Sequence, residues 1–316
     1  MTVISHDSGL TQGSITQPPS GFDRFINTGT KLLAWFFAIG TIALLAYIIY
    51  EIGLSAIPAI KEHGASLITS NEYEPNADKY GLRAPILGTL YSSALALAIA
   101  TVFGLAISIF LSQGFIPRKL EVVFKNIVEL LAAIPSVVYG LWGIYFVIPF
   151  LRDMLEPLGF TLGARSMLPA ALVLAIMVLP TISAISYDAL TSVNPRIKEA
   201  AFGLGATRWE AILKVIVPTA STGIFGSVIL GFGRALGETM ALAMLLGNKN
   251  VFSFSLLDPG NTLAALIANN FPEAGEVEMN VLLFAGMTLL AITLVVNVIG
   301  ASIIQVANRG KKGARQ

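Results

Sequence analysis

The sequence predicts an all-α membrane protein with six transmembrane helices. Only 12% of its 316 residues are charged and 55% are hydrophobic, whereas a soluble domain carries about 25% charged residues. Six apolar runs recur along the chain, each long enough to span, since a helix needs roughly 20 residues to cross the hydrocarbon. The runs show no alternation with period two, so the spans are expected to be helices and not strands of a barrel.

Charged residues bracket the six runs and divide the chain. In chain order the runs are Leu32–Tyr50, Arg83 to Arg118, Glu129 to Arg152, Arg165 to Asp188, the stretch from Lys214 past Arg234 and Glu238, and Glu278 to Arg309. We therefore expect a cytosolic tail at 1–30, a first transmembrane helix at 31–52, an outer loop at 53–83, a core of five transmembrane helices at 84–307 and a basic tail at 308–316. The tail at 1–30 is rich in Gly, Ser, Thr, Gln and Pro, a composition typical of disorder.

The distribution of Lys and Arg predicts the orientation. If the N-terminus is cytosolic, basic residues on the cytosolic side outnumber those outside by about two to one, as the positive-inside rule requires. Both termini and the polar loop at 194–218 are then cytosolic. The two long outer segments, Glu51–Arg83 and Asn248–Met279, are either solvated connectors or a docking surface for an outer partner.

Several kinds of chemistry have no residues to support them in this sequence. The chain has no cysteine, and its two histidines, His6 and His63, lie far apart in polar segments. We therefore expect no metal site, no catalytic residue and no cofactor in this chain. A Gly-x-x-x-x-Gly-Lys-Ser/Thr phosphate loop is also missing from the sequence, so that any ATP hydrolysis must take place on another polypeptide.

The third apolar run contains residues that shape helices. Pro135 removes a backbone donor and is expected to kink the helix. Gly140 is expected to let a neighbouring helix approach closely. Glu129, about one turn inside this run, is interpreted as an edge residue on the cytosolic side.

The polar loop at 194–218 predicts two short helices joined at a glycine turn. Pro195 suits the first helical position, and Glu199 is placed in the first turn, where the helix dipole favours an acid. Gly203 and Gly205 interrupt the helix, and an apolar stripe from Trp209 to Leu213 follows. Such a stripe fits a groove on a partner, and the alternative is a connector packed on its own bundle.

The residues of this loop resemble a known motif. Glu199, Ala200 and Ala201, with Gly205 after them and Val215–Val217 leading to Pro218, resemble the EAA loop of ABC-importer permeases. Val stands where that family often has Ile or Leu. The resemblance covers 84–307, and with 134–140 and 233–241 it is similar to the PstC family of phosphate-importer permease subunits. It implies a MetI-like bundle with one additional N-terminal helix.

The resemblance also implies partners and a location. It implies a PstA-like permease as the second half of a heterodimer, two PstB-like ATPase subunits that bind ATP and Mg²⁺, and a PstS-like phosphate-binding protein outside. The EAA loop would dock on the ATPase, and ATP binding and hydrolysis would alternate the access of the pathway. The expected location is the bacterial cell (inner) membrane, and no nucleic acid is expected as a partner.

Arg234 and Glu238 are the charged residues inside the fifth run. Four residues apart, they are predicted to share one helix face near the middle of the bilayer. A charge there costs roughly 2.5–3.5 kcal/mol on insertion scales, so such residues usually have a function. We expect them to line the substrate pathway, with Arg234 binding an oxyanion and Glu238 accepting a phosphate hydrogen. Gly233 and Gly237 are expected to form a close-packing face.

Alternatives remain open from the sequence alone. Arg234 and Glu238 also fit a structural ion pair, and other oxyanions such as sulfate, molybdate or phosphonate also fit Arg234. An intramembrane enzyme is disfavoured because no second acid or histidine lies at that depth. A non-transporting scaffold or sensor subunit is the remaining alternative.

Overall fold

The structure is a computed structural model that describes residues 21–313. Its contacts divide the chain into two compact units, Met1–Glu51 and Ile52–Gln316. Within the first unit it describes one helical segment, the beginning of α1 (Gly21–His63). The predicted tail at 1–30 is therefore wrong for residues 21–30, because no proline breaks the helix between Gly21 and Pro58. Residues 1–20 lie outside the described part of the chain.

The second unit holds the end of α1 and all later elements. They are α2 (Ser66–Thr69), β1 (Tyr73–Glu74), η1 (Pro75–Ala77), β2 (Lys79–Tyr80), α3 (Arg83–Ser112), α4 (Arg118–Ala133), α5 (Ser136–Trp142), η2 (Gly143–Val147), α6 (Ile148–Leu155), η3 (Glu156–Leu158), α7 (Met167–Thr191), α8 (Pro195–Gly203), α9 (Arg208–Glu210), η4 (Ala211–Ile216), α10 (Val217–Leu236), α11 (Met240–Leu245), α12 (Leu263–Asn270) and α13 (Glu276–Gly313). The expected all-α class is confirmed, since the strands of the described chain, β1 and β2, are two residues long each and form one small hairpin.

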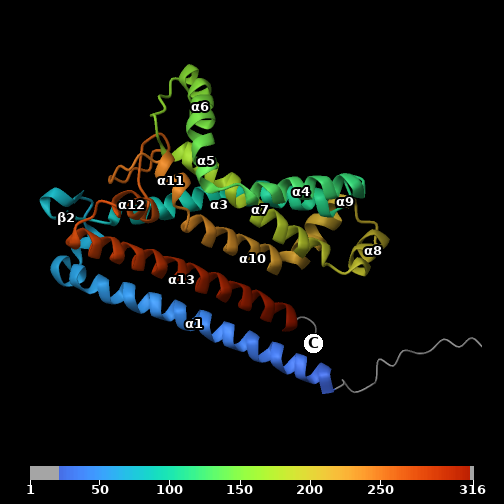
Figure 1. The fold of residues 1–316 in the computed structure, drawn as a ribbon. Coiled ribbons are helices and arrows are strands. Elements are labelled where there is room, and N and C mark those ends of the chain that lie inside the picture. The colour runs from blue at the N-terminus through green and yellow to red at the C-terminus, as the bar shows by residue number, and fades with distance from the viewer. Residues whose placement is uncertain (1–20, 314–316) are drawn as a thin grey trace, which may run out of the picture. The chain divides into compact units, whose positions relative to one another are not determined.

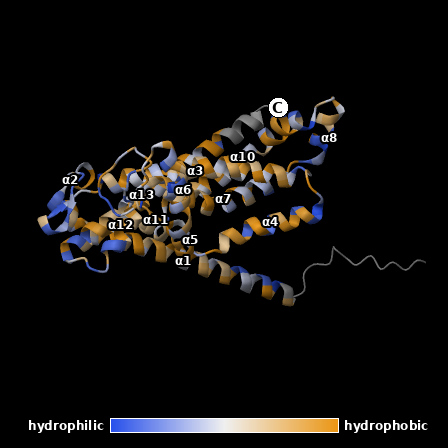
Figure 2. Cartoon of the chain, turned by 90° about the horizontal axis from the view of Figure 1, so that it is seen from above, coloured by the Kyte–Doolittle hydropathy of each residue, from blue (hydrophilic) through white to orange (hydrophobic). Residues whose placement is uncertain are grey.

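Six helices of the described chain are long and apolar enough to cross a membrane. In Figure 1, α3, α7 and α10 run side by side, with α13 along α10. Figure 2 shows hydrophobic residues along these helices and hydrophilic residues gathered toward their two ends. We call these ends the hairpin end, after β1 and β2, and the α8 end.

Small residues allow the central helices to approach closely. A Cβ added at Gly104 of α3 would lie 3.0 Å from Ile182 of α7, and one at Gly223 of α10 would lie 2.5 Å from Ala189. Between the same two helices the hydroxyls of Ser186 and Ser227 are hydrogen-bonded at 2.8 Å. These contacts are van der Waals packing and interhelical hydrogen bonding, the forces that join helices in a membrane.

The third apolar run does not follow the direction of the central helices. The chain leaves α4 at Pro135, where ψ is 142°, and α5, η2 and α6 continue the run. Figures 1 and 2 agree that α6 runs across the direction of α3 and α7. Instead, α4 lies against α7. The charged residues before Glu129 therefore lie on a 16-residue helix that precedes the third run.

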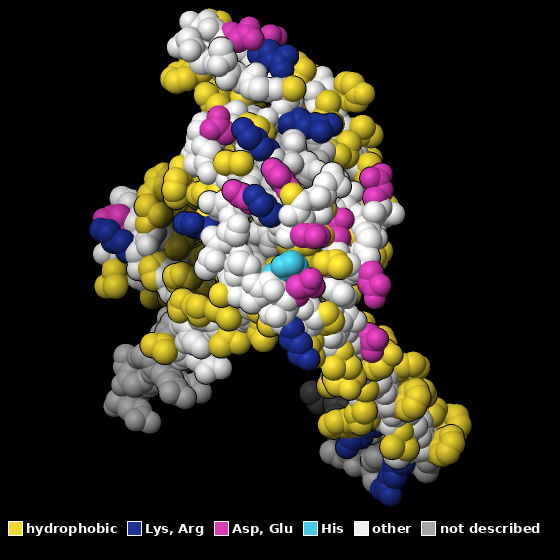
Figure 3. Space-filling view, turned by 90° about the vertical axis from the view of Figure 1, so that its left-hand side faces the viewer, with side chains coloured by type: hydrophobic (Ala, Val, Ile, Leu, Met, Phe, Trp, Pro, Cys, Tyr) yellow, Lys and Arg dark blue, Asp and Glu magenta, His cyan; other side chains and the backbone are white. Residues whose placement is uncertain are grey.

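The hairpin end is polar, and an ion pair and a hydrogen bond join segments of the chain there. Figure 3 looks onto this end and shows acidic and basic side chains gathered on it. Across the hairpin, Lys79 Nζ lies 2.7 Å from Glu72 Oε2. The Tyr73 hydroxyl donates a hydrogen bond of 2.8 Å to Glu278 of α13, and burial raises the pKa of this phenol.

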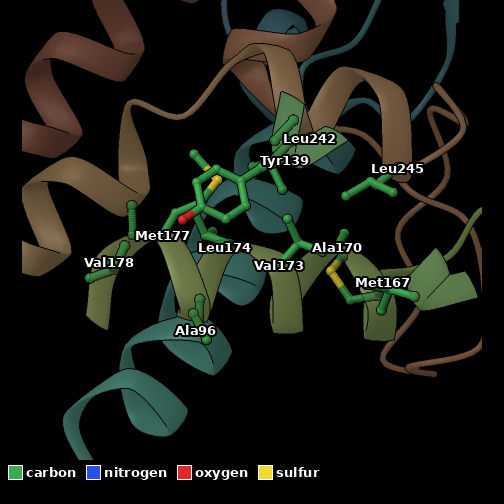
Figure 4. Close-up of a cluster of buried hydrophobic side chains, with 14 of the residues drawn as sticks. Ala96, Tyr139, Met167, Ala170, Val173, Leu174, Met177, Val178, Leu242 and Leu245 are labelled. Atoms are coloured by element: carbon green, nitrogen blue, oxygen red, sulfur yellow. The ribbon is translucent and has the colours of Figure 1, made fainter. Parts of the chain in front are cut away.

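The largest apolar core lies where α5 and α11 meet α7. Figure 4 shows Tyr139 of α5 with its ring over Leu174 and Met177 of α7, and Leu242 and Leu245 of α11 close by. A Cβ added at Gly140 would lie 2.6 Å from the sulfur of Met244 in α11. This position therefore has no room for a larger side chain in the present packing.

Candidate functional site

The loop between α7 and α10 forms the two short helices that the sequence predicts. Asn194 caps α8, since its side chain accepts a hydrogen bond from the Arg196 amide at 3.0 Å. Thr207 and Glu210 form a capping box at the start of α9. Glu199 is the fifth residue of α8, so the expectation that it lies in the first turn is wrong. The predicted chain reversal at Gly205 is present, with φ of +84°.

One side of this loop exposes a set of apolar side chains. Leu204 is 90% exposed, Trp209 57% and Leu213 58%, and Phe202 is also exposed. The helix residues Glu199 and Ala200 are exposed as well, whereas Ala201 is buried. Exposed apolar side chains rimmed by polar ones mark surfaces for a protein partner. Pro218, the last residue of the EAA-like pattern, is at the start of α10.

The opposite side of the loop is fixed to the bundle at the α8 end. Ile212 and Ile216 are buried with Leu190 of α7 and Ala220 of α10 in a small separate core. Lys198 of α8 donates a hydrogen bond of 3.1 Å to Gln113 Oε1, just after α3. A hollow of about 240 Å³ lies beside this contact, lined by Ser112, Gln113, Leu190, Thr191, Val193, Pro195, Lys198 and Ile216.

Arg234 and Glu238 lie at a break between two helices. Helix α10 ends at Leu236 with Gly237 as its C-cap, and α11 begins only at Met240. The prediction that the pair shares one helix face is therefore wrong. Glu238 instead accepts a hydrogen bond from the Ala241 amide at 3.2 Å, which satisfies a backbone donor at the start of α11. No ion pair joins the two residues in the part of the chain that the structure describes.

The Arg234 side chain is exposed in the last turn of α10. A cation there interacts favourably with the helix dipole. Arg234 also interacts electrostatically with Tyr139 of α5, whose hydroxyl donates to the Leu131 carbonyl of α4 at 2.8 Å. Tyr139 and Leu131 both line an apolar hollow of about 280 Å³ between α4, α5 and α7. The other residues that line this hollow are Ile134, Val138, Trp142 and Ile176.

The two predicted features lie at opposite ends of α10. From Val217 to Arg234 the helix rises about 26 Å at 1.5 Å per residue. A Cβ added at Gly233, next to Arg234, would lie 3.6 Å from the side chain of Asn297 in α13. A Cβ added at Gly237 would lie near backbone atoms of its own helix. Gly237 therefore ends α10, and the predicted close-packing face does not extend to it.

A polar stripe on α4 is the feature that the sequence reading missed. The Tyr187 hydroxyl of α7 donates to Glu121 at 2.5 Å. Lys125 lies 3.7 Å from Asp188 and 3.9 Å from Glu129, with its ammonium 4.5 Å from the centre of the Tyr187 ring. The spacing of Glu121, Lys125 and Glu129, four residues apart in turn, was the available signal for one helix face.

Comparisons with known proteins agree with this architecture. Residues 104–312 match the family model of the binding-protein-dependent transport system inner membrane component. The chain is 37% identical over 284 residues to the phosphate transport system permease protein PstC of Haemophilus influenzae, covering 85% of this chain and 90% of that protein. It is 38% identical to the protein of the same name from Mesorhizobium japonicum, covering 82% and 84%.

Solved structures share the fold. A bacterial alginate ABC transporter aligns with a TM-score of 0.63 at 16% identity, covering 87% of this chain and 95% of that chain. The MetNI methionine ABC transporter in an inward-facing conformation aligns with a TM-score of 0.56 at 19% identity, covering 72% and 95%. The helical bundle, the family match and the extent of these similarities together show that the chain belongs to the binding-protein-dependent inner membrane permeases of ABC transporters, and within them to the PstC family.

Proposed function

We propose that this chain is the permease subunit of an ATP-driven importer that carries inorganic phosphate across the inner membrane. The relatives that match over most of its length are named as phosphate transport permeases. The structural observation that best supports an anionic substrate is Arg234, whose side chain is exposed in the last turn of α10, just before the break at Gly237. Phosphate recognition commonly uses Arg, whose planar fork matches an oxyanion and stays charged.

The chemistry of the break suits a hydrogen-bearing oxyanion. Near neutral pH phosphate retains at least one hydrogen, whereas sulfate has none to donate. Glu238 uses one carboxylate oxygen to accept from the Ala241 amide. A carboxylate has about four lone-pair sites, so that Glu238 retains capacity for a phosphate hydroxyl. We propose that Arg234 supplies the charge and Glu238 the discrimination between phosphate and sulfate.

The power for transport would come from another polypeptide. We propose that the exposed face of the α8–α9 loop, with Leu204, Trp209 and Leu213, lies in a cleft of a PstB-like ATPase, one of two copies. ATP and Mg²⁺ would be bound there. A PstA-like permease would form the other half of the pathway, and a PstS-like protein would deliver phosphate at the hairpin end. This assignment makes the α8 end cytosolic, and we propose from the distribution of basic residues that both termini are cytosolic too.

The test is phosphate uptake by vesicles that contain the whole transporter, with ATP inside. Arg234→Ala should lower the uptake efficiency roughly 10- to 150-fold, since hydrogen bonds to charged groups contribute about 1.5–3 kcal/mol. Glu238→Gln should reduce the preference for phosphate over sulfate in a competition assay. Arg152→Ala, an arginine of α6 away from the break, is the matched control. Wild-type uptake by both Arg234→Ala and Glu238→Gln would refute a role for this pair.

A further inference from the structure

We propose that Gln113 is a positioning residue that fastens both arms of the α8–α9 loop to the start of α4, so that the loop and α4 move together. The proposal rests on the proposed ATPase-coupled function. Gln113 lies in the turn between α3 and α4 and is only 5% exposed. Its side-chain oxygen accepts from Lys198 of α8 at 3.1 Å, and its backbone carbonyl accepts from Arg208 of α9 at 2.6 Å.

Two basic residues from different arms of the loop therefore converge on one buried residue. Lys198 and Arg208 are separated in sequence by the Gly205 turn, and both donate to Gln113. Without them, the Gln113 side-chain oxygen and backbone carbonyl oxygen would each lose a donor, which is costly for buried acceptors in a low-dielectric environment. The two hydrogen bonds to Gln113 thus join α8 and α9 to this turn in a specific way.

Aromatic contacts reinforce the tie from the same turn. The guanidinium carbon of Arg208 lies 3.9 Å from the centre of the Phe115 ring, a distance at which a cation–π attraction operates. Phe115 also contacts Trp209 of α9, with ring centres 5.4 Å apart, and stacks on Phe110 of α3 at 6.0 Å. We call Gln113, Phe115, Lys198, Arg208 and Trp209 the bracket.

The turn that carries the bracket leads directly into α4. Pro117 is the N-cap of α4, which begins at Arg118. No residue of α4 is buried, so the helix is held mainly at one face, by the bonds of Glu121 and Lys125 to α7. A helix with so few buried contacts has a low cost of displacement. Further along, its Leu131 lines the hollow beside Tyr139.

These contacts define a continuous route from the loop to the pathway. Movement of the α8–α9 loop displaces Gln113 and Phe115, and the short turn transmits the displacement to α4. Leu131, the α4 residue that lines the hollow, then moves with the loop. Helix α10 follows the loop in the chain and also connects the two ends of the bundle. In this arrangement α4 provides a second connection between them.

The experiment measures a distance within the whole transporter in nanodiscs. Because the chain has no cysteine, Arg196→Cys on α8 and Lys119→Cys on α4 can be spin-labelled as a pair. The distance distribution is recorded with ADP and with ATP under conditions that block hydrolysis. With the bracket intact, the distance between the labels should be the same in both states. With Gln113→Leu, which keeps the size of the side chain, it should differ between the states.

Transport provides the second readout. Gln113→Leu and Lys198→Met should lower phosphate uptake per ATP hydrolysed by roughly threefold to tenfold, the effect of one net hydrogen bond. Lys198→Arg, which keeps a donor toward Gln113, should restore the coupling. Lys214→Ala, a lysine of the same loop that pairs with Glu210 instead, is the control for the distance measurement.

The outcomes separate this proposal from the proposed function. If Gln113→Leu leaves both the label distances and the uptake per ATP at wild-type values, the bracket does not transmit motion. If the distance between the labels differs between ADP and ATP while the bracket is intact, the bracket likewise does not make the loop and α4 move together. If instead the ATPase does not co-purify with the unaltered chain, the proposed coupled function is wrong, whatever the bracket does.

Discussion

The turn at Gly205 offers a sharp test of how the α8–α9 loop is held. Gly205 has φ of +84°, and no atom lies within 4 Å of an added Cβ. Its amide donates to the Phe202 carbonyl at 2.9 Å, and the Ala206 amide donates to the Ala201 carbonyl at 3.1 Å. This pair of bonds is the Schellman arrangement, in which glycine commonly occupies the left-handed position.

Replacing Gly205 by alanine changes only the backbone preference, since the added methyl group meets nothing. A non-glycine residue in the left-handed region costs about 1–2 kcal/mol. Gly203 is the matched control, because it also has no atom within 4 Å of an added Cβ but has no positive φ. Alanine there should be neutral or should stabilise α8 by up to about 1 kcal/mol.

The assay is amide hydrogen exchange of the loop in the purified protein. Gly205→Ala should speed exchange of the amides at 204 to 206 by roughly 5- to 30-fold, the factor that corresponds to 1–2 kcal/mol. Gly203→Ala should leave this exchange unchanged or slow it. Equal exchange in the two variants would show that the turn is not held in the left-handed conformation by its own bonds, and the reasoning would fail.

Three further expectations concern other parts of the molecule. Leu213→Asp should reduce co-purification of the ATPase while leaving the thermal stability of the chain within about 0.5 kcal/mol, because the side chain is mainly exposed. Gly88→Ala should destabilise the fold by about 1–3 kcal/mol, since its Cβ would lie 2.0 Å from the Asn261 carbonyl oxygen. The Lys79 contact lowers the pKa of Glu72. The stabilising effect of this pair on the hairpin is therefore full above the ordinary pKa of Glu72 and is lost as pH falls through the lowered pKa.

Each of these expectations has a control and a measurement. Leu213→Met keeps an apolar surface and should retain the ATPase, so loss of binding in both variants would point away from a surface effect. For the glycine, thermal unfolding of Gly226→Ala, where an added Cβ meets nothing, should match the wild type. The Gly81 amide donates to the Glu72 carbonyl, and its protection against hydrogen exchange, taken relative to the intrinsic exchange rate at each pH, should fall on acidification. If this loss of protection persists in Glu72→Gln, the carboxylate is not its cause.

The long helices and the glycine turn follow from local chemistry, so the sequence was sufficient to predict them. Charge-free runs of membrane length leave the chain no alternative to helix, and the spacing of Pro195 and Gly205 marks the bounds of α8. The extent of α1 was less clear, because its polar ends carry the same residue types as a loop. Only the absence of proline between Pro19 and Pro58 was compatible with a helix that begins as early as Gly21.

The break after Leu236 could not be predicted from local preference. The stretch from Gly233 to Met240 is compatible with one continuous helix, and Arg234 and Glu238 have the spacing of a helical pair. In the structure Leu236 and Leu242 are both buried. Glu238 accepts a hydrogen bond from the Ala241 amide at the start of α11. Tertiary burial thus overrides the local pattern. Similarly, Lys125 of α4 forms an ion pair with Asp188, which is more than 60 residues away in sequence. The packing of Lys125 against α7 could therefore not be inferred from residues close to it in sequence.

The π-helical turn η4 determines how α10 is rotated about its own axis. In a π-helix each hydrogen bond spans five residues, one more than in an α-helix, so the segment Ala211–Ile216 holds one residue in excess of a regular helix. Each α-helical residue turns the chain by about 100° and advances it 1.5 Å. A rearrangement of this one turn into regular α-helix would therefore swing the Arg234 side chain about the axis of α10 by about that angle, with little sliding of the helix.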